Sequence, residues 1–270
     1  MHFIYSAAKR KVVAAMHSRL KISIVLTISF LLLTLFWINP VMATEKAEIT
    51  SEQLVAFFDT FFSGAIEENI IPGAVIAVVQ KDNLLFSGGY SYADLEKRDK
   101  VSPSETIFFV ESVSKSFTAK AVMQLVDEGL IDLEADVNDY LSGFQLPDIY
   151  KQPVTVTDLL VHTAGFDDTD IGAYAKSEAG VTPLGEYLKH NLLARVMPPG
   201  EVVSYSNHGY ALAGLMVEEV SGIPFIRYMD QHILGPLEMT SSSFVLSTEM
   251  EEKLAPPYLN TGRKFEPDIN

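Results

Sequence analysis

The chain contains no cysteine and only one tryptophan among its 270 residues. The lack of cysteine excludes a disulfide framework, thiolate chemistry and any metal site that needs cysteine ligands. Internal repeats and low-complexity segments are absent as well. Hydrophobic residues make up 48% of the chain and charged residues 20%, which argues against disorder and supports one large domain or two small ones around a buried core.

Positive charge is scarce beyond the N-terminal segment. Residues 1–43 hold five Lys or Arg and no Asp or Glu, which leaves 15 basic and 35 acidic residues for the rest, a net charge of −20. Such an acidic surface disfavours nucleic acid as a partner, and the remaining basic residues form no phosphate-binding cluster. Solubility is the simplest explanation of the acidity.

An uncharged run of 17 residues, Ile22–Ile38, follows two basic residues and precedes Pro40–Ala43. This pattern predicts an export signal cleaved after Ala43. An uncleaved membrane anchor is the alternative, because the run is at the short limit for spanning a bilayer. Both interpretations place residues 44–270 outside the cytoplasm, secreted or membrane-anchored. Met16 is a second candidate for the start of translation.

The predicted elements run in the order helix, hairpin, then mostly helices. Thr50–Gln53 fits a capping box before apolar residues at helical spacing: Leu54, Val55, Phe57, Phe58, Phe61, Phe62 and Ala65. We expect the phenylalanine-rich stripe of residues 57–62 to be core. Ala74–Val79 and Leu84–Tyr90 form a predicted hairpin. This order indicates an α+β fold, in which Ser243–Leu246 is the best later candidate for a strand.

Five later segments have the periodicity and end signals of helices. They are Ser112–Glu128, Thr155–His162, Pro183–Leu193, Asn207–Val220 and Pro224–Leu234. The first has a predicted buried stripe of Phe117, Ala121, Val122, Leu125 and Val126. Gly129 and Gly222 are expected to end two of these helices, and Asn207 is a candidate N-cap.

Ser112 and Lys115 form a Ser-x-x-Lys motif at the start of a predicted helix. A serine hydroxyl needs a nearby base to become a nucleophile, and residues three apart on a helix share a face. Ser6/Lys9 and Ser18/Lys21 match the same pattern but lie before or within the export segment, where no active site assembles.

Tyr205-Ser206-Asn207 directly precedes another predicted helix and could complete such a site. The other Tyr-x-Asn match, Tyr258/Asn260, follows two prolines and is expected to lie in an irregular loop. Context therefore selects Tyr205 and Asn207.

Three segments together resemble the serine β-lactamases of the class C type and their penicillin-binding, esterase and D-aminopeptidase relatives. The matching text is FFVESVSKSFTA at Phe108–Ala119, TVTDLLVHTAGF at Thr155–Phe166 and PPGEVVSYSNHGYALAG at Pro198–Gly214. Gly129–Leu141 and Gly235–Thr240 match less strongly. The segments follow the order of the family and span about residues 71–243.

The resemblance implies a β-lactamase/transpeptidase-like fold, in which a helical lobe packs on an antiparallel sheet with the site between them. It implies Ser112 as the acylated nucleophile and Lys115 as its proton acceptor. Tyr205 would be a second acid/base group and Asn207 a contact to the substrate amide. His162 falls in a family segment that is usually structural. No cofactor and no metal are expected, and the implied partners are small molecules or peptides of the peptidoglycan type.

The third motif of the family, Lys or His followed by Ser or Thr and then Gly, is not found where the resemblance places it. His162–Gly165 comes too early, Asn260–Gly262 has the wrong first residue, and the sequence stops at Asn270. We therefore expect residues 44–270 to form a β-lactamase-related domain that lacks its C-terminal strands. By the resemblance, one oxyanion donor lies on those strands, and its loss would lower the rate about 100- to 1000-fold.

Two functions follow from these observations. The first is an exported serine hydrolase that acts through a serine acyl-enzyme on an amide, ester or β-lactam. The second is a truncated or non-catalytic penicillin-binding-like protein that binds cell-wall peptide or acylates without turnover. For either function, residues 1–43 allow association with the membrane. Asp167, Asp168 and Asp170 could suggest a metal site, but no His or Glu lies at matching spacing.

Overall fold

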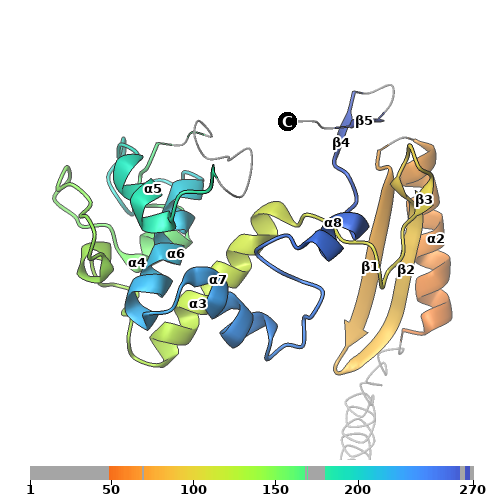
Figure 1. The fold of residues 1–270 in the computed structure, drawn as a ribbon, viewed down its shortest axis with the longest axis horizontal. Coiled ribbons are helices and arrows are strands. Elements are labelled where there is room, and N and C mark those ends of the chain that lie inside the picture. Colours follow the sequence, from red (N-terminus) through yellow and green to blue (C-terminus); the bar gives the residue numbers. More distant parts are fainter. Residues whose placement is uncertain (1–48, 69, 168, 170–179, 262–264, 268–270) are drawn as a thin grey trace, which may run out of the picture. The chain divides into compact units, whose positions relative to one another are not determined.

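The computed structural model describes residues 49–68, 70–167, 169, 180–261 and 265–267, and Figure 1 shows their fold. The chain divides into two compact units within the first described helix, between Phe58 and Asp59. The export segment predicted for residues 1–43 lies outside the described residues. No helix within the described ranges is long and apolar enough to cross a membrane.

The elements follow the order that the sequence predicts, a helix, then a hairpin, then mostly helices. The helices are α2 (Ser51–Glu67), α3 (Ser114–Asp127), α4 (Val156–Leu160), α5 (Leu184–His190), α6 (Asn207–Ser221), α7 (Phe225–Tyr228) and α8 (Thr248–Lys253). Turns of 3₁₀ helix form η1 (Glu111–Val113) and η2 (Val137–Tyr140), and η4 (Met229–Leu234) is a π-helix. The strands are β1 (Gly73–Gln80), β2 (Asn83–Asp94), β3 (Asp99–Lys100), β4 (Tyr258–Asn260) and β5 (Phe265–Pro267).

Helix α2 begins at the predicted capping box. The Thr50 N–H donates to Gln53 Oε1 (3.0 Å), and the Gln53 N–H donates to Thr50 Oγ1 (3.3 Å). The prediction that the whole phenylalanine stripe is core is wrong, because Phe57 is 60% exposed and Phe61 57% exposed.

Phe62 is the buried member of this stripe. Its ring stacks on Tyr90 of β2 at 4.6 Å, and the Tyr90 hydroxyl donates to Asp59 Oδ1 (3.0 Å). Successive residues of a helix point about 100° apart, so Phe61 turns away from the face that meets Tyr90. An apolar stripe on a helix shows which face tends to be buried. Which residues of that face become buried depends on the surface that packs against it.

The predicted hairpin is confirmed. Strand β1 pairs antiparallel with β2 from Gly73↔Ser91 to Gln80↔Asn83, with an irregularity at Val78/Val79, and β3 adds to the other edge of β2. Figure 1 shows β1 and β2 as long neighbouring arrows.

Two predictions about the later strands are wrong. Ser243–Leu246 is not a strand. Tyr258, expected in an irregular loop, begins β4, which pairs with β5. The Tyr258 hydroxyl also accepts a hydrogen bond from the Leu95 N–H (2.9 Å). A strand forms only where another segment pairs with it, and the pattern of one segment does not reveal its partner.

Helices α3 to α7 and η4 share one hydrophobic core whose buried members lie between Ala121 and Ile233. The predicted stripe of α3 is confirmed: three members are buried and two are partly buried against the core, namely Ala121, Val122 and Leu125, then Phe117 and Val126. The expected ends are confirmed as well, because both terminal glycines adopt left-handed backbone, Gly129 with φ +73° and Gly222 with φ +68°.

The other helix limits differ by small amounts from those predicted. Helix α4 starts after Thr155, which makes a reciprocal capping box with Asp158, and ends at Leu160 rather than His162. The helix predicted over Pro224–Leu234 is α7 continued by the π-helix η4.

Candidate active site

Ser112 lies on a tight turn that leads directly into α3. The turn is η1, and α3 begins two residues after the serine. Glu111, just before Ser112, has φ +42°, a conformation that few residues other than glycine adopt. At this junction the Ser116 hydroxyl donates to the Val113 carbonyl (2.7 Å). This geometry presents the exposed Ser112 side chain at the N-terminal end of a helix that is anchored in the core.

The structure brings Ser112, Lys115 and Tyr205 together. Lys115 Nζ donates to Ser112 Oγ at 3.1 Å, and the Tyr205 hydroxyl lies 2.6 Å from the same oxygen, with either hydroxyl able to donate. Lys115 Nζ is also 4.8 Å from the centroid of the Tyr205 ring. The serine oxygen therefore has two proton-transfer groups within hydrogen-bond distance, the arrangement that an activated serine requires.

Tyr205 is held by the segment that connects α4 to the rest of the helical region. The Gly200 N–H donates to the Thr163 carbonyl (2.9 Å), and the Val196 N–H donates to the Gly165 carbonyl (2.8 Å). A Cβ on Gly165 would collide with the Met197 carbonyl, so only glycine allows the two backbones to approach so closely. These contacts help to bring Tyr205, 93 residues from Ser112 in the sequence, to the start of α3.

Asn207 does not cap α6, and the prediction that it does is wrong by one residue. The N-cap is Ser206, whose buried Oγ accepts from the Gly209 N–H (3.0 Å). Asn207 is the first helical residue, and its exposed side chain makes no hydrogen bond or ion pair with the described part of the chain. The amide is thus available to a ligand.

The motif spacing did not identify Tyr210, whose ring lies near Lys115. Its hydroxyl donates to the Leu160 carbonyl (2.9 Å), and Lys115 Nζ is 6.0 Å from its ring centroid. Burial raises the pKa of Tyr210, with a smaller contribution from Tyr205, so the phenol stays protonated and keeps donating. The available signal was its place one helical turn beyond Tyr205-Ser206-Asn207.

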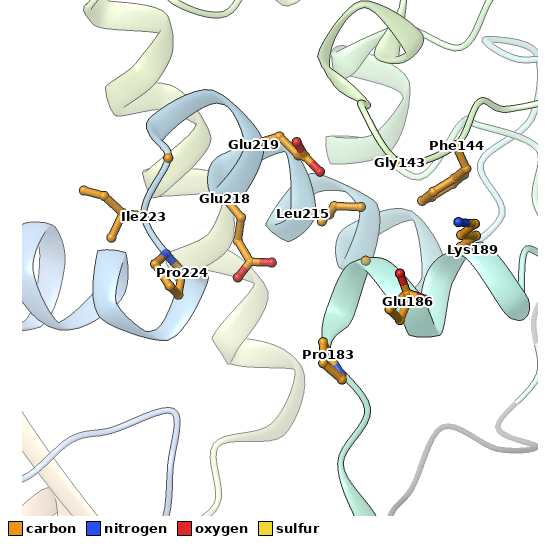
Figure 2. A pocket seen from close by; sticks show the side chains of 12 residues that line it. Gly143, Phe144, Pro183, Glu186, Lys189, Leu215, Glu218, Glu219, Ile223 and Pro224 are labelled. Carbon is orange, nitrogen blue, oxygen red and sulfur yellow. The ribbon is translucent and has the colours of Figure 1, made fainter.

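Two other candidate sites do not compete with this one. Within the described ranges no group of three His, Cys, Asp or Glu side chains could hold a metal ion, and Asp168 and Asp170 lie outside those ranges. An open pocket of about 480 Å³ is lined by α5, α6 and a nearby loop (Figure 2). Its lining includes Glu186, Leu215 and Glu218 but none of the four predicted site residues.

Comparison with known proteins gives consistent results. The family model described as Beta-lactamase matches residues 58–269. Protein flp of Staphylococcus aureus (strain MRSA252) is 31% identical over 199 residues, which cover 69% of this chain and 37% of that protein. The octameric penicillin-binding protein homologue from Pyrococcus abyssi superposes with a TM-score of 0.65 at 30% identity, covering 79% of this chain and 50% of that one. A class C beta lactamase superposes with a TM-score of 0.65 at 23% identity, covering 83% and 60%.

The fold and the matches place the chain among proteins related to β-lactamases and penicillin-binding proteins. The chain belongs to the beta-lactamase family. The expected β-lactamase/transpeptidase-like fold is confirmed. The chain spans 37% of the Staphylococcus relative and half of the Pyrococcus chain.

Proposed function

We propose that this chain is an exported serine acyl-transfer enzyme that acts on an amide, an ester or a β-lactam. The observation that carries the proposal is the position of Ser112 Oγ, 3.1 Å from Lys115 Nζ and 2.6 Å from the Tyr205 hydroxyl. Each distance is short enough for direct proton transfer.

The proposed reaction uses these groups in sequence. Neutral Lys115 accepts the Ser112 proton while Oγ forms a bond to the substrate carbonyl carbon. Collapse of the tetrahedral intermediate breaks the bond to the leaving amine or alkoxide, which takes a proton from Tyr205. Water then hydrolyses the acyl-enzyme with the same groups acting in reverse. The free side chain of Asn207 is suited to contact the substrate amide.

The relatives support the substrate class. A solved structure that is 30% identical is described as a penicillin-binding protein homologue. Penicillins are β-lactams, in which an amide carbonyl is the electrophile that a serine attacks. The net negative charge beyond residue 43 supports a small-molecule or peptide partner rather than nucleic acid.

A labelling experiment tests the proposal. The full chain is incubated with a fluorescent penicillin and, separately, with a fluorophosphonate, and labelling is read on a denaturing gel. We expect Ser112→Ala to abolish labelling and Ser116→Ala to leave it intact, because Ser116 lies on α3 and its hydroxyl donates to the Val113 carbonyl. Equal labelling of the Ser112→Ala protein would overturn the assignment.

Turnover distinguishes the enzyme from the alternative function. Nitrocefin and a short-chain p-nitrophenyl ester report steady hydrolysis. A single burst without further turnover would identify a protein that acylates and then stays acylated, as a penicillin-binding-like protein would.

We also propose that residues 1–43 direct the domain out of the cytoplasm. The uncharged run Ile22–Ile38 and the basic residues before it support this. The intact mass of the protein recovered from an expressing bacterium tests it. A mature chain beginning at Thr44 is expected for a cleaved signal, an uncut membrane-bound chain for an anchor, and an uncut cytoplasmic chain would overturn export.

A further inference from the structure

The His162 imidazole makes a specific contact beneath the tyrosine of the site. Its Nδ1 accepts a hydrogen bond from the Ser206 backbone N–H at 3.1 Å. Its ring lies against the Tyr205 ring, with centroids 4.4 Å apart and planes tilted by 31°. The His162 carbonyl also accepts from the Ser204 N–H (2.8 Å). One residue therefore holds the residues on both sides of Tyr205 and supports the ring between them.

Helix α6 has no side chain of its own that can accept a hydrogen bond from the N–H of its N-cap residue. Ser206 is the N-cap of α6, and in a capping box the third helical residue reaches back to the N–H of the N-cap. Here that position is Gly209, which has no side chain. His162 supplies the acceptor instead, from a segment 44 residues earlier.

The backbone of His162 has the conformation that this contact requires. Its φ is +62°, in the left-handed region that glycine adopts freely and that asparagine and histidine adopt more readily than most residues. The conformation ends the α4 segment and turns the imidazole toward Ser206. The bond needs an unprotonated Nδ1, so the neutral ring carries its proton on Nε2.

We infer that His162 is a positioning residue for Tyr205, which acts by accepting the Ser206 N–H and so fixes the Tyr205 hydroxyl 2.6 Å from Ser112 Oγ. The expected effect on the acylation rate rests on the proposed acyl transfer. The hydrogen bond from Ser206 to His162 does not depend on that proposal. His162 touches neither substrate nor reacting atoms in this role. Loss of the contact would displace Tyr205, and a shift of about 1 Å in a reacting group costs roughly 100-fold in rate.

The test compares two substitutions that both tolerate left-handed backbone. His162→Gly removes the acceptor, whereas His162→Asn keeps a short side-chain oxygen that can take the Ser206 N–H. We expect His162→Gly to lower the rate of Ser112 acylation about 100-fold and His162→Asn to retain most of the rate. In a Tyr205→Phe background, His162→Gly should have little further effect, because both changes remove the same group.

Hydrogen exchange of the Ser206 amide in the full chain gives a readout that needs no activity. We expect exchange to be roughly fivefold faster in His162→Gly, which corresponds to one lost hydrogen bond, and close to wild type in His162→Asn. Unchanged exchange in His162→Gly, or equal acylation rates in the glycine and asparagine variants, would overturn the inference. If the wild-type chain does not acylate at all, the proposed function fails, and the exchange rates still decide whether His162 holds Ser206.

Discussion

The helical region and the β1–β2–β3 sheet bury their residues to very different degrees. The core of the helical region contains side chains with almost no exposed surface, among them Leu159, Leu212 and Met216 at 0%. In β1, β2 and β3 the only buried residue is Asp94. Val79 and Leu84 of the hairpin are 62% and 63% exposed. Each fully buried aliphatic side chain contributes about 1.5–3 kcal/mol, so the helical region holds most of the packing energy of the described chain.

The site belongs to the better packed of these two regions. Lys115 lies on α3, which is anchored in the core by Ala121, Val122 and Leu125. Tyr205 lies directly before α6, the helix with the most buried residues. The three proposed catalytic groups thus keep hydrogen-bond distances although the hairpin is only half buried. The helical region, not the sheet, positions the proposed nucleophile and its proton-transfer groups.

The largest effect is expected from Lys115→Arg. Arginine is a basic side chain of similar length, but it stays protonated at any usable pH and so cannot accept the serine proton as neutral lysine does. General-base catalysis contributes about 100- to 10,000-fold, and the rate of Ser112 acylation should fall by that factor. Lys120→Arg on the same helix is the matched control, because Lys120 is exposed and away from the serine. Acylation of the Lys115→Arg protein at the wild-type rate would remove the lysine from the mechanism.

Leucine-to-alanine substitutions measure the contrast between the regions directly. Leu212→Ala in α6 should lower the free energy of unfolding by about 2–5 kcal/mol, because it leaves a cavity in a closed core. Leu84→Ala in the hairpin should change it by less than about 0.5 kcal/mol. Urea unfolding of both proteins provides the values. Equal losses would mean that the hairpin is packed as tightly as the helices.

Removal of helix N-caps should distinguish well-buried from poorly buried elements in the same way, with smaller effects on stability. Ser206→Ala removes the cap of α6 and should cost about 0.5–2 kcal/mol, with slower acylation because Tyr205 is the preceding residue. Ser247 caps α8 through the Met250 N–H (3.2 Å), but α8 has no buried residue. Ser247→Ala should therefore destabilise the protein less and leave acylation unchanged. Slower acylation in Ser247→Ala would show that α8 also supports the site.

Alkaline pH tests the support of the hairpin by α2. Burial raises the pKa of Tyr90 to about 12, and the hydrogen bond to Asp59 adds to the shift. Because the folded state holds this proton more tightly than the unfolded state does, the stabilisation is complete below pH 10 and is lost as the pH rises toward 12. Tyr90→Phe should weaken the dependence of the unfolding temperature on pH in this range. An identical pH dependence in both proteins would rule out Tyr90 as its source.

The sequence predicts the helices and the proximity of Ser112 and Lys115 better than the strands. Helix ends depend on local capping, which Thr155 with Asp158 and the left-handed Gly129 show clearly. The pair Ser112 and Lys115 is local as well, three residues apart on one turn. The strand predicted over Ser243–Leu246 is wrong, because a strand needs a partner and none is encoded nearby.

Contacts between distant segments mark the limit of prediction from the sequence. The Asn207 cap is wrong because its neighbour Ser206 is equally suited to capping, and a pattern does not distinguish two adjacent polar residues. The exposure of Phe57 depends on tertiary contacts that a helical period does not contain. The bond from Ser206 to His162 spans 44 residues and has no signature in either local segment.

The proposed role of Ser112 as the nucleophile is tested most directly by locating the covalent adduct in the wild-type chain. The full-length protein is reacted with a fluorophosphonate and digested, and tandem mass spectrometry identifies the modified residue. We expect a single adduct on Ser112, although Ser116 lies only four residues away and is also exposed. An adduct on another residue, or an unmodified Ser112 in a folded protein, would contradict it.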